Sequence, residues 1–344
     1  MTTNLHVENC RLGQSSGCAE EELSIASVTV AYNGATVLRR HLDSLRRQTR
    51  KLNEIVIVNN ASTDNTFNLL ATECPEATVL NLPANVGVGG GFAAGIAYAA
   101  LRKKHDWIWI FDQDSVPSGD ALERLLAGQQ HLQGTEEYPA ILAPVCIHPE
   151  TGMIYPALSW RGWRFRPTPG SAEQPITFAD VTISSGSLIR SEAVNKAGLP
   201  RADFFMDFVD YEYCLRLRRN GFRIAVVRDS ILSHAIGTPT TLHILGRTKY
   251  WTDHVPWREY YMARNELFTL WQYYPEWRSK AFTLSRLARH ALGLLLFGKQ
   301  KLACIGMMFR GFLDGRAGRL GIRFGGTTPA LRLDSTALDL RQGE

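Results

Sequence analysis

Residues 107–115 read WIWIFDQDS, a run of five large apolar residues followed by two carboxylates, Asp112 and Asp114. An unbroken apolar run of this length is typical of a strand in a parallel sheet, where both faces are buried. Residues 54–58, EIVIV, form a second such run. In an open α/β sheet, ligands bind beyond the carboxyl ends of the strands. The pattern therefore predicts a parallel sheet with a ligand site directly after residue 111.

Around these two runs the chain alternates between strand and helix patterns. This alternation predicts an α/β fold with a Rossmann-like, mostly parallel sheet flanked by helices, followed by a C-terminal helical region. Further strands are expected at 25–31 and 77–82, and helices at 34–48, 63–74 and 91–103. Beyond residue 130 we expect short strands up to 190, a helix at 209–220 closed by Gly221, a strand at 222–227, and helices at 257–274, 278–296 and 301–313.

Composition excludes several classes of protein. The 344 residues are 45% hydrophobic and 21% charged, which excludes long disorder, collagen and a coiled coil. The six cysteines form no C-x-x-C pair, which argues against a zinc ribbon or a disulfide scaffold and favours a reducing compartment. The N-terminus lacks an apolar signal segment, and the apolar stretch 291–297 is shorter than the roughly 20 residues of a spanning helix. We therefore expect a cytoplasmic protein that is not integral to a membrane.

Basic charge is concentrated near the C-terminus. The net charge of +5 is too mild to indicate a nucleic-acid partner. Residues 278–323, however, hold ten Lys and Arg and one acid, so they carry +9 and the remainder carries −4. Apolar residues at helical spacing, from Leu284 to Phe297, accompany these bases, a combination that suits peripheral contact with an anionic inner membrane. The alternative is that the helices pack on the preceding domain with their bases in solvent.

The polar segments after the first strands allow both functional and structural interpretations. The carboxylates of Asp112 and Asp114 suit Mg²⁺ or Mn²⁺, which is bound by few carboxylates together with phosphates. Asp and Ser are also common in solvated turns after strands. Residues 59–64, NNASTD, include good helix N-caps, although capping does not explain the paired asparagines.

Residues 85–91, NVGVGGG, form a glycine-rich segment that opens a helix. Glycines let the backbone approach a ligand closely, and a helix N-terminus favours a diphosphate. The same segment supports a different function, because Gly89, Gly91 and Ala94 fit the G-x-G-x-x-A pattern of dinucleotide-binding oxidoreductases. Two strand–helix units precede this segment, however, and Asp112 is one of a pair of acids, which both count against that function.

Residues 204–216, FFMDFVDYEYCLR, place three acids at the start of a helix. A capping box would make Asp207 the N-cap and put Asp210 at the third helical position. A helix N-terminus also keeps Asp210 ionised, as a general base requires. His234 follows the expected strand 222–227, and it is a natural metal ligand only if a metal already lies nearby.

Taken together and in this order, the segments resemble the family 2 glycosyltransferases of GT-A fold, over roughly residues 25–275. The resemblance rests on VTVAYNG at 28–34, VNNASTDNT at 58–66, NVGVGGG at 85–91, DQD at 112–114, SSGSLI at 184–189 and FVDYE at 208–212. Within the family the chain is most similar to the rhamnosyltransferases, and among these to those of rhamnolipid synthesis. This closer likeness rests on DQDS at 112–115, HAIGT at 234–238, REYYMARN at 258–265 and FLDGRAG at 312–318.

The resemblance implies an inverting, metal-dependent transfer of L-rhamnose from dTDP-L-rhamnose to a hydroxyl of a glycolipid. The acceptor would be mono-rhamnolipid, giving di-rhamnolipid, or a lipid-linked sugar. Asp210 would be the catalytic base, and Mg²⁺ or Mn²⁺ would be bound by Asp114, with His234 as a further ligand. The residues that would border the donor are Ala31, Tyr32, Asn33, Asn60, Asn85, Gly87, Gly90, Gly91 and Asp112.

The expected organisation is a flexible tail (1–23), a GT-A catalytic domain (24–255), C-terminal amphipathic basic helices (256–325) and a second tail (326–344). Within the catalytic domain, 24–130 would bind the nucleotide sugar and 131–255 the acceptor. The chain departs from the family at three positions, because Asn60 stands where many relatives have aspartate, Ala94 where they have asparagine, and Val209 where glutamate usually precedes the base. Two alternatives stay open: a nucleotide-dependent oxidoreductase, and a non-catalytic sugar- or membrane-binding protein that keeps the fold.

Overall fold

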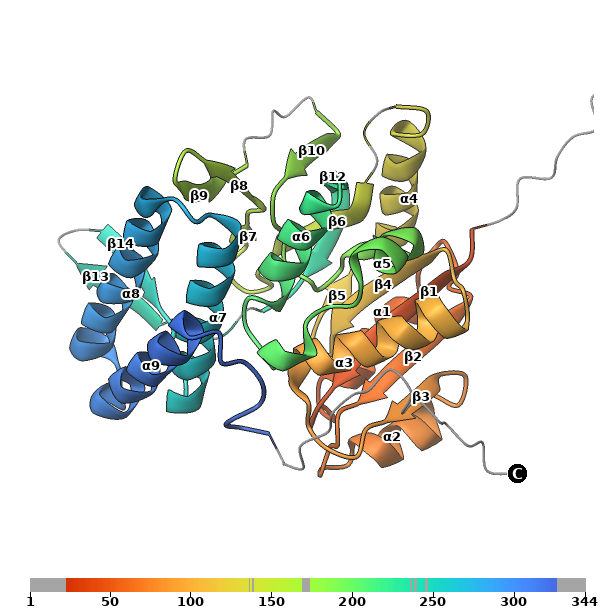
Figure 1. Ribbon diagram of the computed structural model, residues 1–344. Coiled ribbons are helices and arrows are strands. Elements are labelled where there is room, and N and C mark those ends of the chain that lie inside the picture. The colour runs from red at the N-terminus through yellow and green to blue at the C-terminus, as the bar shows by residue number, and fades with distance from the viewer. Residues whose placement is uncertain are drawn as a thin grey trace, which may run out of the picture.

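The sheet at the centre of the molecule combines a parallel half with a mixed half (Figure 1). The computed structural model describes residues 23–135, 137, 139–168, 174–235, 237, 240–244 and 247–326. In these residues the strand order is β10-β12-β6-β11-β4-β1-β2-β3, with β5 paired to β12 and β7 to β6. These strands are β1 (Ile25–Ala31), β2 (Glu54–Asn59), β3 (Thr78–Asn81), β4 (Trp107–Asp112), β5 (Val116–Pro117), β6 (Pro139–Ile147), β7 (Ile154–Tyr155), β10 (Ile176–Ala179), β11 (Leu188–Arg190) and β12 (Arg223–Ser233).

Helices cover both faces of the sheet, and three long helices stand beside it (Figure 1). The helices before residue 220 are α1 (Leu38–Arg46), α2 (Thr66–Glu73), α3 (Gly87–Ile96) with its π-helical continuation (Ala97–Arg102), α4 (Ala121–His131), α5 (Ser191–Ala197), a 3₁₀ turn (Ala202–Phe204) and α6 (Val209–Arg219). The C-terminal helices are α7 (Pro256–Tyr273), α8 (Trp277–Phe297) and α9 (Lys301–Arg316). Two small hairpins complete the fold: β8 (Leu158–Arg161) with β9 (Arg164–Pro167), and β13 (Thr240–Ile244) with β14 (Arg247–Trp251).

The parallel pairing of β1 with both β2 and β4 confirms the α/β fold expected from the apolar runs. Its register places Ala31 beside Asn59 and Val30 beside Asp112, so three strands end at one edge. Farther along, β11 runs antiparallel between β4 and β6, and β12 runs parallel to β6. The expected mostly parallel sheet, with flanking helices and a C-terminal helical region, is therefore present.

Burial on both faces explains why β4 is so apolar. The ring of Trp109 is fully buried and meets Phe111 edge-on at 4.6 Å between ring centroids. Its indole N–H donates to the carbonyl of Gly186 at 2.8 Å, so the polar group of this side chain is satisfied. Burying a side chain of this class contributes about 1.5–3 kcal/mol to folding. The strand that carries Asp112 at its end is thus firmly anchored.

Two expected element boundaries were wrong. The glycine-rich helix begins at Gly87 rather than 91, because its glycines serve helix-to-sheet packing: a Cβ on Gly91 would lie 2.6 Å from a methyl group of Val30. The sequence analysis also missed α4 and α5, and β12 extends to Ser233 instead of ending at 227. The helix closure at Gly221 was correct, since this residue has φ +85°.

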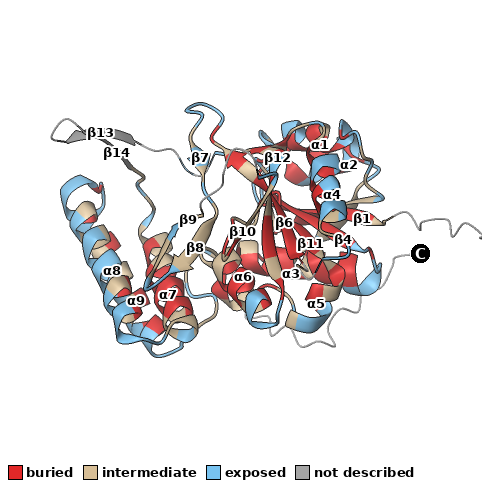
Figure 2. Ribbon diagram, turned by 90° about the horizontal axis from the view of Figure 1, so that it is seen from above, coloured by how far each residue is buried: buried red, intermediate tan, exposed pale blue. Residues whose placement is uncertain are grey.

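Small residues bring α9 unusually close to α7. A Cβ on Gly311 would lie 2.2 Å from the carbonyl oxygen of Tyr260, and one on Gly315 would lie 2.6 Å from that of Arg264. On the opposite side, α8 presents exposed residues to solvent (Figure 2). Among the helices that the structure describes, none combines the length and the apolar character needed to cross a bilayer.

We predict that Gly311→Ala lowers the free energy of unfolding by about 1–3 kcal/mol, because the new methyl group must push the two helices apart. Gly306→Ala is the matched control: it lies in the same helix, and a Cβ there meets nothing within 4 Å. That control should be neutral or stabilising by up to about 1 kcal/mol, as alanine favours a helix over glycine. Urea unfolding measures both, and equal midpoints for the two variants would contradict the close packing.

Candidate active site

The pairing of β12 with β5 brings His234 to the turn that follows β4. Ser233, the last residue of β12, lies opposite Val116 in an antiparallel pair. The turn itself is closed by a hydrogen bond from the N–H of Ser115 to the carbonyl of Asp112, at 3.2 Å. His234 therefore faces the D-Q-D segment, although it lies 119 positions from Ser115 in the chain.

The two carboxylates and the imidazole form one electrostatic cluster. Nε2 of His234 lies 3.5 Å from Oδ2 of Asp112, and Nδ1 lies 3.3 Å from Oδ1 of Asp114. The hydroxyl of Ser115 is also 3.0 Å from Nδ1. His234 is 8% exposed, so little solvent screens these contacts. The structure thus brings together the three residues that the sequence nominated for the metal or its vicinity.

The pKa shifts in this cluster follow from burial and charge. Burial alone would lower the pKa of His234, but hydrogen bonding to Asp114 and the charge of Asp112 outweigh it and raise that pKa. Burial raises the pKa of Asp112, and the charge of Asp114 adds to this. Burial acts the same way on Asp114, yet hydrogen bonding to His234 and its charge lower the pKa of that carboxyl overall. The two carboxylates therefore favour the protonated form of the imidazole that lies between them.

In the described part of the chain, no group of three or more His, Cys, Asp and Glu side chains is arranged to hold a metal ion on its own. The carboxylates of Asp112 and Asp114 are nevertheless donors of the kind that Mg²⁺ and Mn²⁺ prefer. Such ions are commonly held by one or two carboxylates plus oxygens of a bound phosphate. The donor set fits an ion that arrives with a diphosphate.

His41, which the sequence analysis missed, lies in α1 and supports the D-Q-D turn through a hydrogen bond to Ser115. Its Nδ1 lies 2.6 Å from the carbonyl oxygen of Ser115, and its Nε2 lies 2.8 Å from the hydroxyl of Thr29. Burial lowers the pKa of His41 to about 4, so the ring is neutral. Nδ1–H therefore donates to the carbonyl and Nε2 accepts from the hydroxyl. The signal in the sequence was its place on the buried face of the expected helix 34–48.

Ser185 supports the same turn from the SSGSLI segment. Its hydroxyl accepts from the N–H of Asp112 at 3.0 Å and lies 2.6 Å from the hydroxyl of Ser115. A chain of hydrogen bonds thus runs from Asp112 through the two serines to His234. The two serines and His234 are buried, so the turn has little freedom to move.

A cavity of about 620 Å³ lies on one side of this turn, at the carboxyl ends of β1 and β4. Of the residues expected to border the donor, six line it: Tyr32, Asn33, Asn60, Asn85, Gly87 and Asp112. Three do not. Ala31 is buried within β1, while Gly90 and Gly91 lie inside α3, where added Cβ atoms would meet Val86 and Val30.

The walls of this cavity are held by side-chain amides. Nδ2 of Asn60 donates to the carbonyl of Gly87 and to Oδ1 of Asn85, each at 3.1 Å, and its Oδ1 accepts from Val86 N–H at 2.9 Å. The amide of Gln113 pairs with both backbone groups of Tyr32, at 2.8 and 3.1 Å. Asn60 therefore shapes the cavity, a role that capping did not account for, whereas Asn59 bonds to Asn81 and to the N–H of Ser62.

A second cavity, of about 510 Å³, lies on the other side of Asp112 and contains Asp210. The two cavities share Val88, Asp112 and Met206. Six apolar side chains contribute to the lining of the second cavity, together with the ion pair of Glu266 and Arg286: Leu158, Phe165, Ile183, Met262, Leu270 and Phe282. An apolar portion of a ligand would therefore be covered there, with its polar end near the carboxylates.

Asp210 has the most perturbed carboxyl group of this region. Its burial raises the pKa to about 7, helped by the negative charges of Asp207 and Asp112, although Tyr211 N–H donates to its Oδ1 at 2.9 Å. A carboxylate with a pKa near neutrality is suited to accept a proton at physiological pH.

The capping-box interpretation of this segment was wrong. The residue before α6 is Phe208, with φ +62°, and no side chain caps the helix. Asp207 instead pairs with the guanidinium of Arg258 at 3.0 and 3.2 Å. The dinucleotide pattern finds no support either, because Cβ atoms on Gly89 and Gly91 would meet protein atoms, the carbonyl of Arg201 and the side chain of Val30.

Comparison with known proteins agrees with this arrangement. Residues 27–135 match the sequence family described as Glycosyl transferase family 2. The chain is 28% identical over 248 residues to the dTDP-rhamnosyl transferase RfbF of Shigella flexneri, covering 72% of this chain and 80% of that protein. It is also 25% identical to the galactofuranosyltransferase GlfT1 of Mycolicibacterium smegmatis, covering 72% of this chain and 83% of that one.

Solved structures share the fold at low sequence identity. GalNAc-T7, crystallised with UDP, GalNAc and Mn²⁺, superposes with a TM-score of 0.58 at 15% identity, over 87% of this chain and 56% of that chain. Residues 1–349 of S. aureus TarS, in complex with UDP-GlcNAc, give a TM-score of 0.54 at 17% identity, over 85% of this chain and 81% of that one. Residues 27–135 are therefore similar to the family 2 glycosyltransferases, and the chain shares the fold of these solved structures.

Proposed function

We propose that the protein is an inverting, metal-dependent glycosyltransferase that moves L-rhamnose from dTDP-L-rhamnose to a hydroxyl of a glycolipid. The observation that carries this proposal is the meeting of two cavities at Asp112, with the D-Q-D turn on one side and Asp210 on the other. The first cavity receives the nucleotide sugar and the second receives the acceptor. The similarity to a dTDP-rhamnosyl transferase supports rhamnose as the transferred sugar.

An amphiphilic acceptor agrees with the lining of the second cavity. The lining combines apolar side chains such as Phe165, Leu270 and Phe282 with polar ones such as Asp210 and Arg258. Mono-rhamnolipid, which would become di-rhamnolipid, has this division between a sugar and an aliphatic part, and so does a lipid-linked sugar. Residues 131–255 then form the acceptor half of a catalytic domain that spans 24–255, with the helices after 255 completing the wall.

Asp210 acts as the base in this scheme. The acceptor hydroxyl attacks the anomeric carbon from the face opposite the diphosphate, and Asp210 takes its proton as the bond forms. Because its pKa is raised to about 7, the carboxylate is both partly ionised and basic enough to accept the proton at neutral pH. A single displacement inverts the anomeric centre and needs no covalent enzyme intermediate.

The D-Q-D turn serves the leaving diphosphate. Asp114 and Asp112 would hold Mg²⁺ or Mn²⁺, with the imidazole of His234 as a further ligand once it has lost its proton. Such an ion supplies Lewis-acid stabilisation of the charge that develops on the diphosphate. The hydrogen bonds from His41 and Ser185 keep the turn in place for this task.

The experiment that tests the function is a donor panel of dTDP-L-rhamnose, UDP-galactofuranose, UDP-glucose and GDP-mannose, assayed with mono-rhamnolipid and with a polyprenyl-linked sugar. Transfer from dTDP-L-rhamnose with inversion is the expected result. Reduction of a substrate by NAD(P)H would support the oxidoreductase alternative. Binding of dTDP without transfer from any donor would support the non-catalytic alternative.

We predict that Asp210→Asn lowers kcat by 10²-fold or more, since general base catalysis contributes about 10²–10⁴-fold. In the wild type, kcat/KM should rise with pH and level off above about 7, where the carboxylate is ionised. The variant should melt at the same or a higher temperature, because it no longer buries a charge. Asp120→Asn, at a surface pair with Arg124, is the control and should turn over normally. Normal turnover by Asp210→Asn would exclude it as the base.

We predict that chelation abolishes transfer, that Mg²⁺ or Mn²⁺ restores it, and that Asp114→Asn raises the metal concentration required for half-maximal rate. Calorimetry with Mn²⁺ in the presence of dTDP should give a weaker affinity for the variant. Full activity of Asp114→Asn in the presence of chelator would show that the D-Q-D segment is a turn without a metal.

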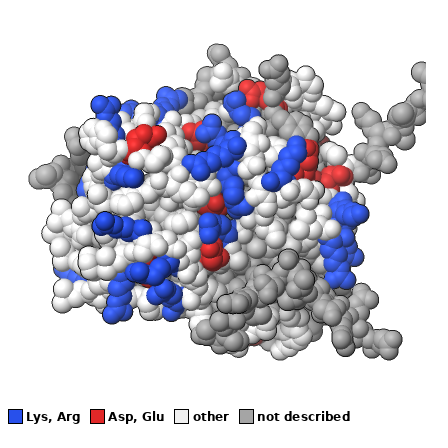
Figure 3. Space-filling view, viewed as in Figure 1, with Lys and Arg blue, Asp and Glu red and all other residues white. Residues whose placement is uncertain are grey.

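The C-terminal helices suit contact with an anionic inner membrane, where such an acceptor resides. From residue 277 to 313 the sequence contains seven bases and no acid. Only Leu287 and Leu294 of the leucines of α8 are buried, whereas Leu292 and Leu296 are 55% and 58% exposed. Leu302, at the start of α9, is 83% exposed. Figure 3 shows basic side chains among wide uncharged areas on the side of the molecule formed by these helices.

We predict that the protein floats with liposomes containing anionic lipid at low salt and is released by high salt, since each base near such a surface contributes about 1 kcal/mol. Leu296→Ser combined with Leu302→Ser should weaken flotation. Leu101→Ser, at a leucine that is 47% exposed on the other part of the molecule, is the matched control. A wild type that stays in the soluble fraction at low salt would contradict the membrane contact.

A further inference from the structure

The turn that leads into Asp210 has an unfavourable backbone conformation. Phe205, Asp207 and Phe208 have φ values of +67°, +54° and +62°, in the left-handed region that residues with a Cβ rarely adopt. Three such residues within four positions persist only where the surroundings hold them. Because the turn ends two residues before Asp210, whatever holds it also sets where that carboxylate lies.

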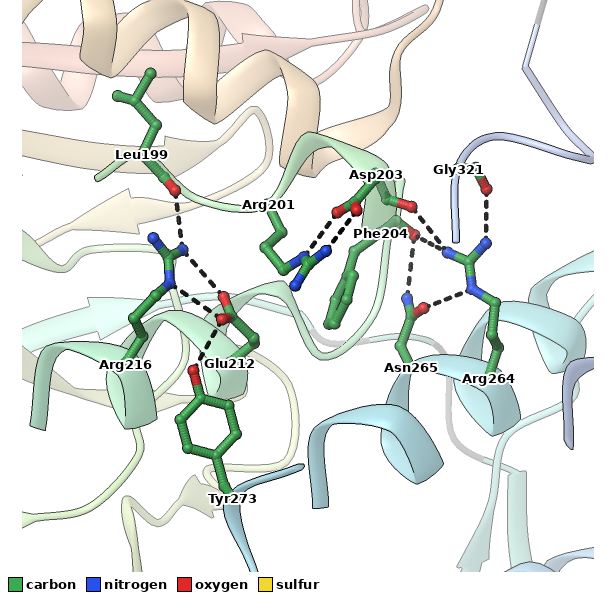
Figure 4. A network of polar contacts seen from close by, with 10 residues as sticks. All are labelled: Leu199, Arg201, Asp203, Phe204, Glu212, Arg216, Arg264, Asn265, Tyr273 and Gly321. Atoms are coloured by element: carbon green, nitrogen blue, oxygen red, sulfur yellow. Dashed lines mark hydrogen bonds and ion pairs between the residues drawn. The ribbon is translucent and has the colours of Figure 1, made fainter. Parts of the chain in front are cut away.

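Two adjacent side chains of α7 hold this turn by its carbonyl groups (Figure 4). Nδ2 of Asn265 lies 3.0, 2.7 and 3.0 Å from the carbonyl oxygens of Phe204, Met206 and Asp207. Nη2 of Arg264 donates to the carbonyls of Asp203 and Phe204, each at 3.0 Å. Every residue from 203 to 207 except Phe205 therefore has its carbonyl bound by this pair.

The two side chains also fix one another. Nε of Arg264 donates to Oδ1 of Asn265 at 2.8 Å, which orients the amide so that its N–H groups face the turn. The guanidinium lies over the rings of Tyr260 and Tyr261, and its Nη1 donates to the carbonyl of Gly321 at 2.6 Å. Both side chains are fully buried. A guanidinium buried against carbonyl groups, rather than against a carboxylate, is suited to organising backbone.

The carbonyl of Phe205 is not bound by Arg264 or Asn265 of α7. It accepts a hydrogen bond from the start of α3 instead. The N–H of Gly89 donates to it at 3.1 Å, and a Cβ on Gly87 would lie 2.1 Å from it, so only glycine allows this approach. The turn is thus enclosed between the start of α3 and the middle of α7. On the far side of Asp210, the hydroxyl of Tyr273 donates to Glu212 at 3.0 Å, which gives α7 a second hold on the same segment (Figure 4).

We propose that Asn265 and Arg264 are positioning residues, which fix the place of Asp210 by holding the carbonyl groups of residues 203–207. This inference rests on the proposed role of Asp210 as the base. Neither side chain lines either cavity, so their effect on transfer is indirect. Loss of the hold allows the turn to relax from its left-handed conformation, and the carboxylate then no longer lies beside the acceptor hydroxyl.

The test is Asn265→Ala, which removes the amide donors from α7. Thr269→Val is the matched control, since Thr269 is also fully buried on α7, one turn later, and its hydroxyl has no hydrogen-bond partner in the described residues. We expect kcat of Asn265→Ala to fall by about 10–10²-fold, because small displacements of a reacting group have effects of this size. The KM for the donor and the Kd for dTDP should stay within about twofold of the wild type.

All rates are measured below the melting temperature of each variant, with circular dichroism confirming the folded state. If Asn265→Ala does not fold, Asn265→Ser, which keeps one donor, takes its place in the same comparison. A folded variant with wild-type kcat overturns the proposal, as does an equal loss of kcat in Thr269→Val. A wild type that transfers no sugar refutes the proposed function instead, so the two failures are distinguishable.

Discussion

The contact between His234 and the carboxylates of Asp112 and Asp114 is the interaction on which the site depends. Two carboxylates two residues apart repel each other, and a positive group between them relieves that repulsion. His234 lies between the two carboxylates, and they raise its pKa and so favour its protonated form. It also joins the end of β12 to the end of β4, and so the two halves of the sheet meet where the cavities meet. Asp112 and Asp114 would hold a divalent ion together with oxygens of a bound diphosphate, and that ion would supply positive charge at the same place.

The two sides of the site are built by different means. The first cavity lies at an edge of the parallel part of the sheet, where strand register places Asp112 beside Val30 of β1, and amides such as that of Asn60 complete the wall. The second cavity has no such template. It is assembled from a turn, a hairpin and the helices α7 and α8, and the turn is held by side chains that bind its backbone carbonyls. Substitutions behind the second cavity can therefore alter its shape without touching a ligand.

The sequence predicted the parts of the molecule that follow from local pattern. The apolar runs at 54–58 and 107–111 became central strands, and the polar residues after them met at one edge as expected. Asp114 and His234 were nominated separately and lie in contact. The sequence did not reveal the contacts of His41, which has the spacing of an ordinary core residue, or those of Arg264 and Asn265, whose partners are carbonyl groups about 60 residues away. Every residue has a backbone carbonyl, so the sequence does not show which carbonyl a buried donor will bind. Such contacts are seen only in the structure.

The hold of α7 on residues 203–207 has a consequence for synthesis on the ribosome. The chain emerges from its N-terminus, and the strands up to Ser233 can pair as soon as they are outside the exit tunnel. The carbonyl groups of the turn, however, gain their hydrogen bonds only after Arg264 and Asn265 have been synthesised. The guanidinium of Arg264 gains its hydrogen bond to Gly321 later still. A nascent chain can thus have paired the strands of its central sheet while the position of the Asp210 carboxylate is not yet fixed. The turn before Asp210, and with it the part of the first cavity formed by Phe205 and Met206, is therefore completed only once residues 257–325 have been synthesised.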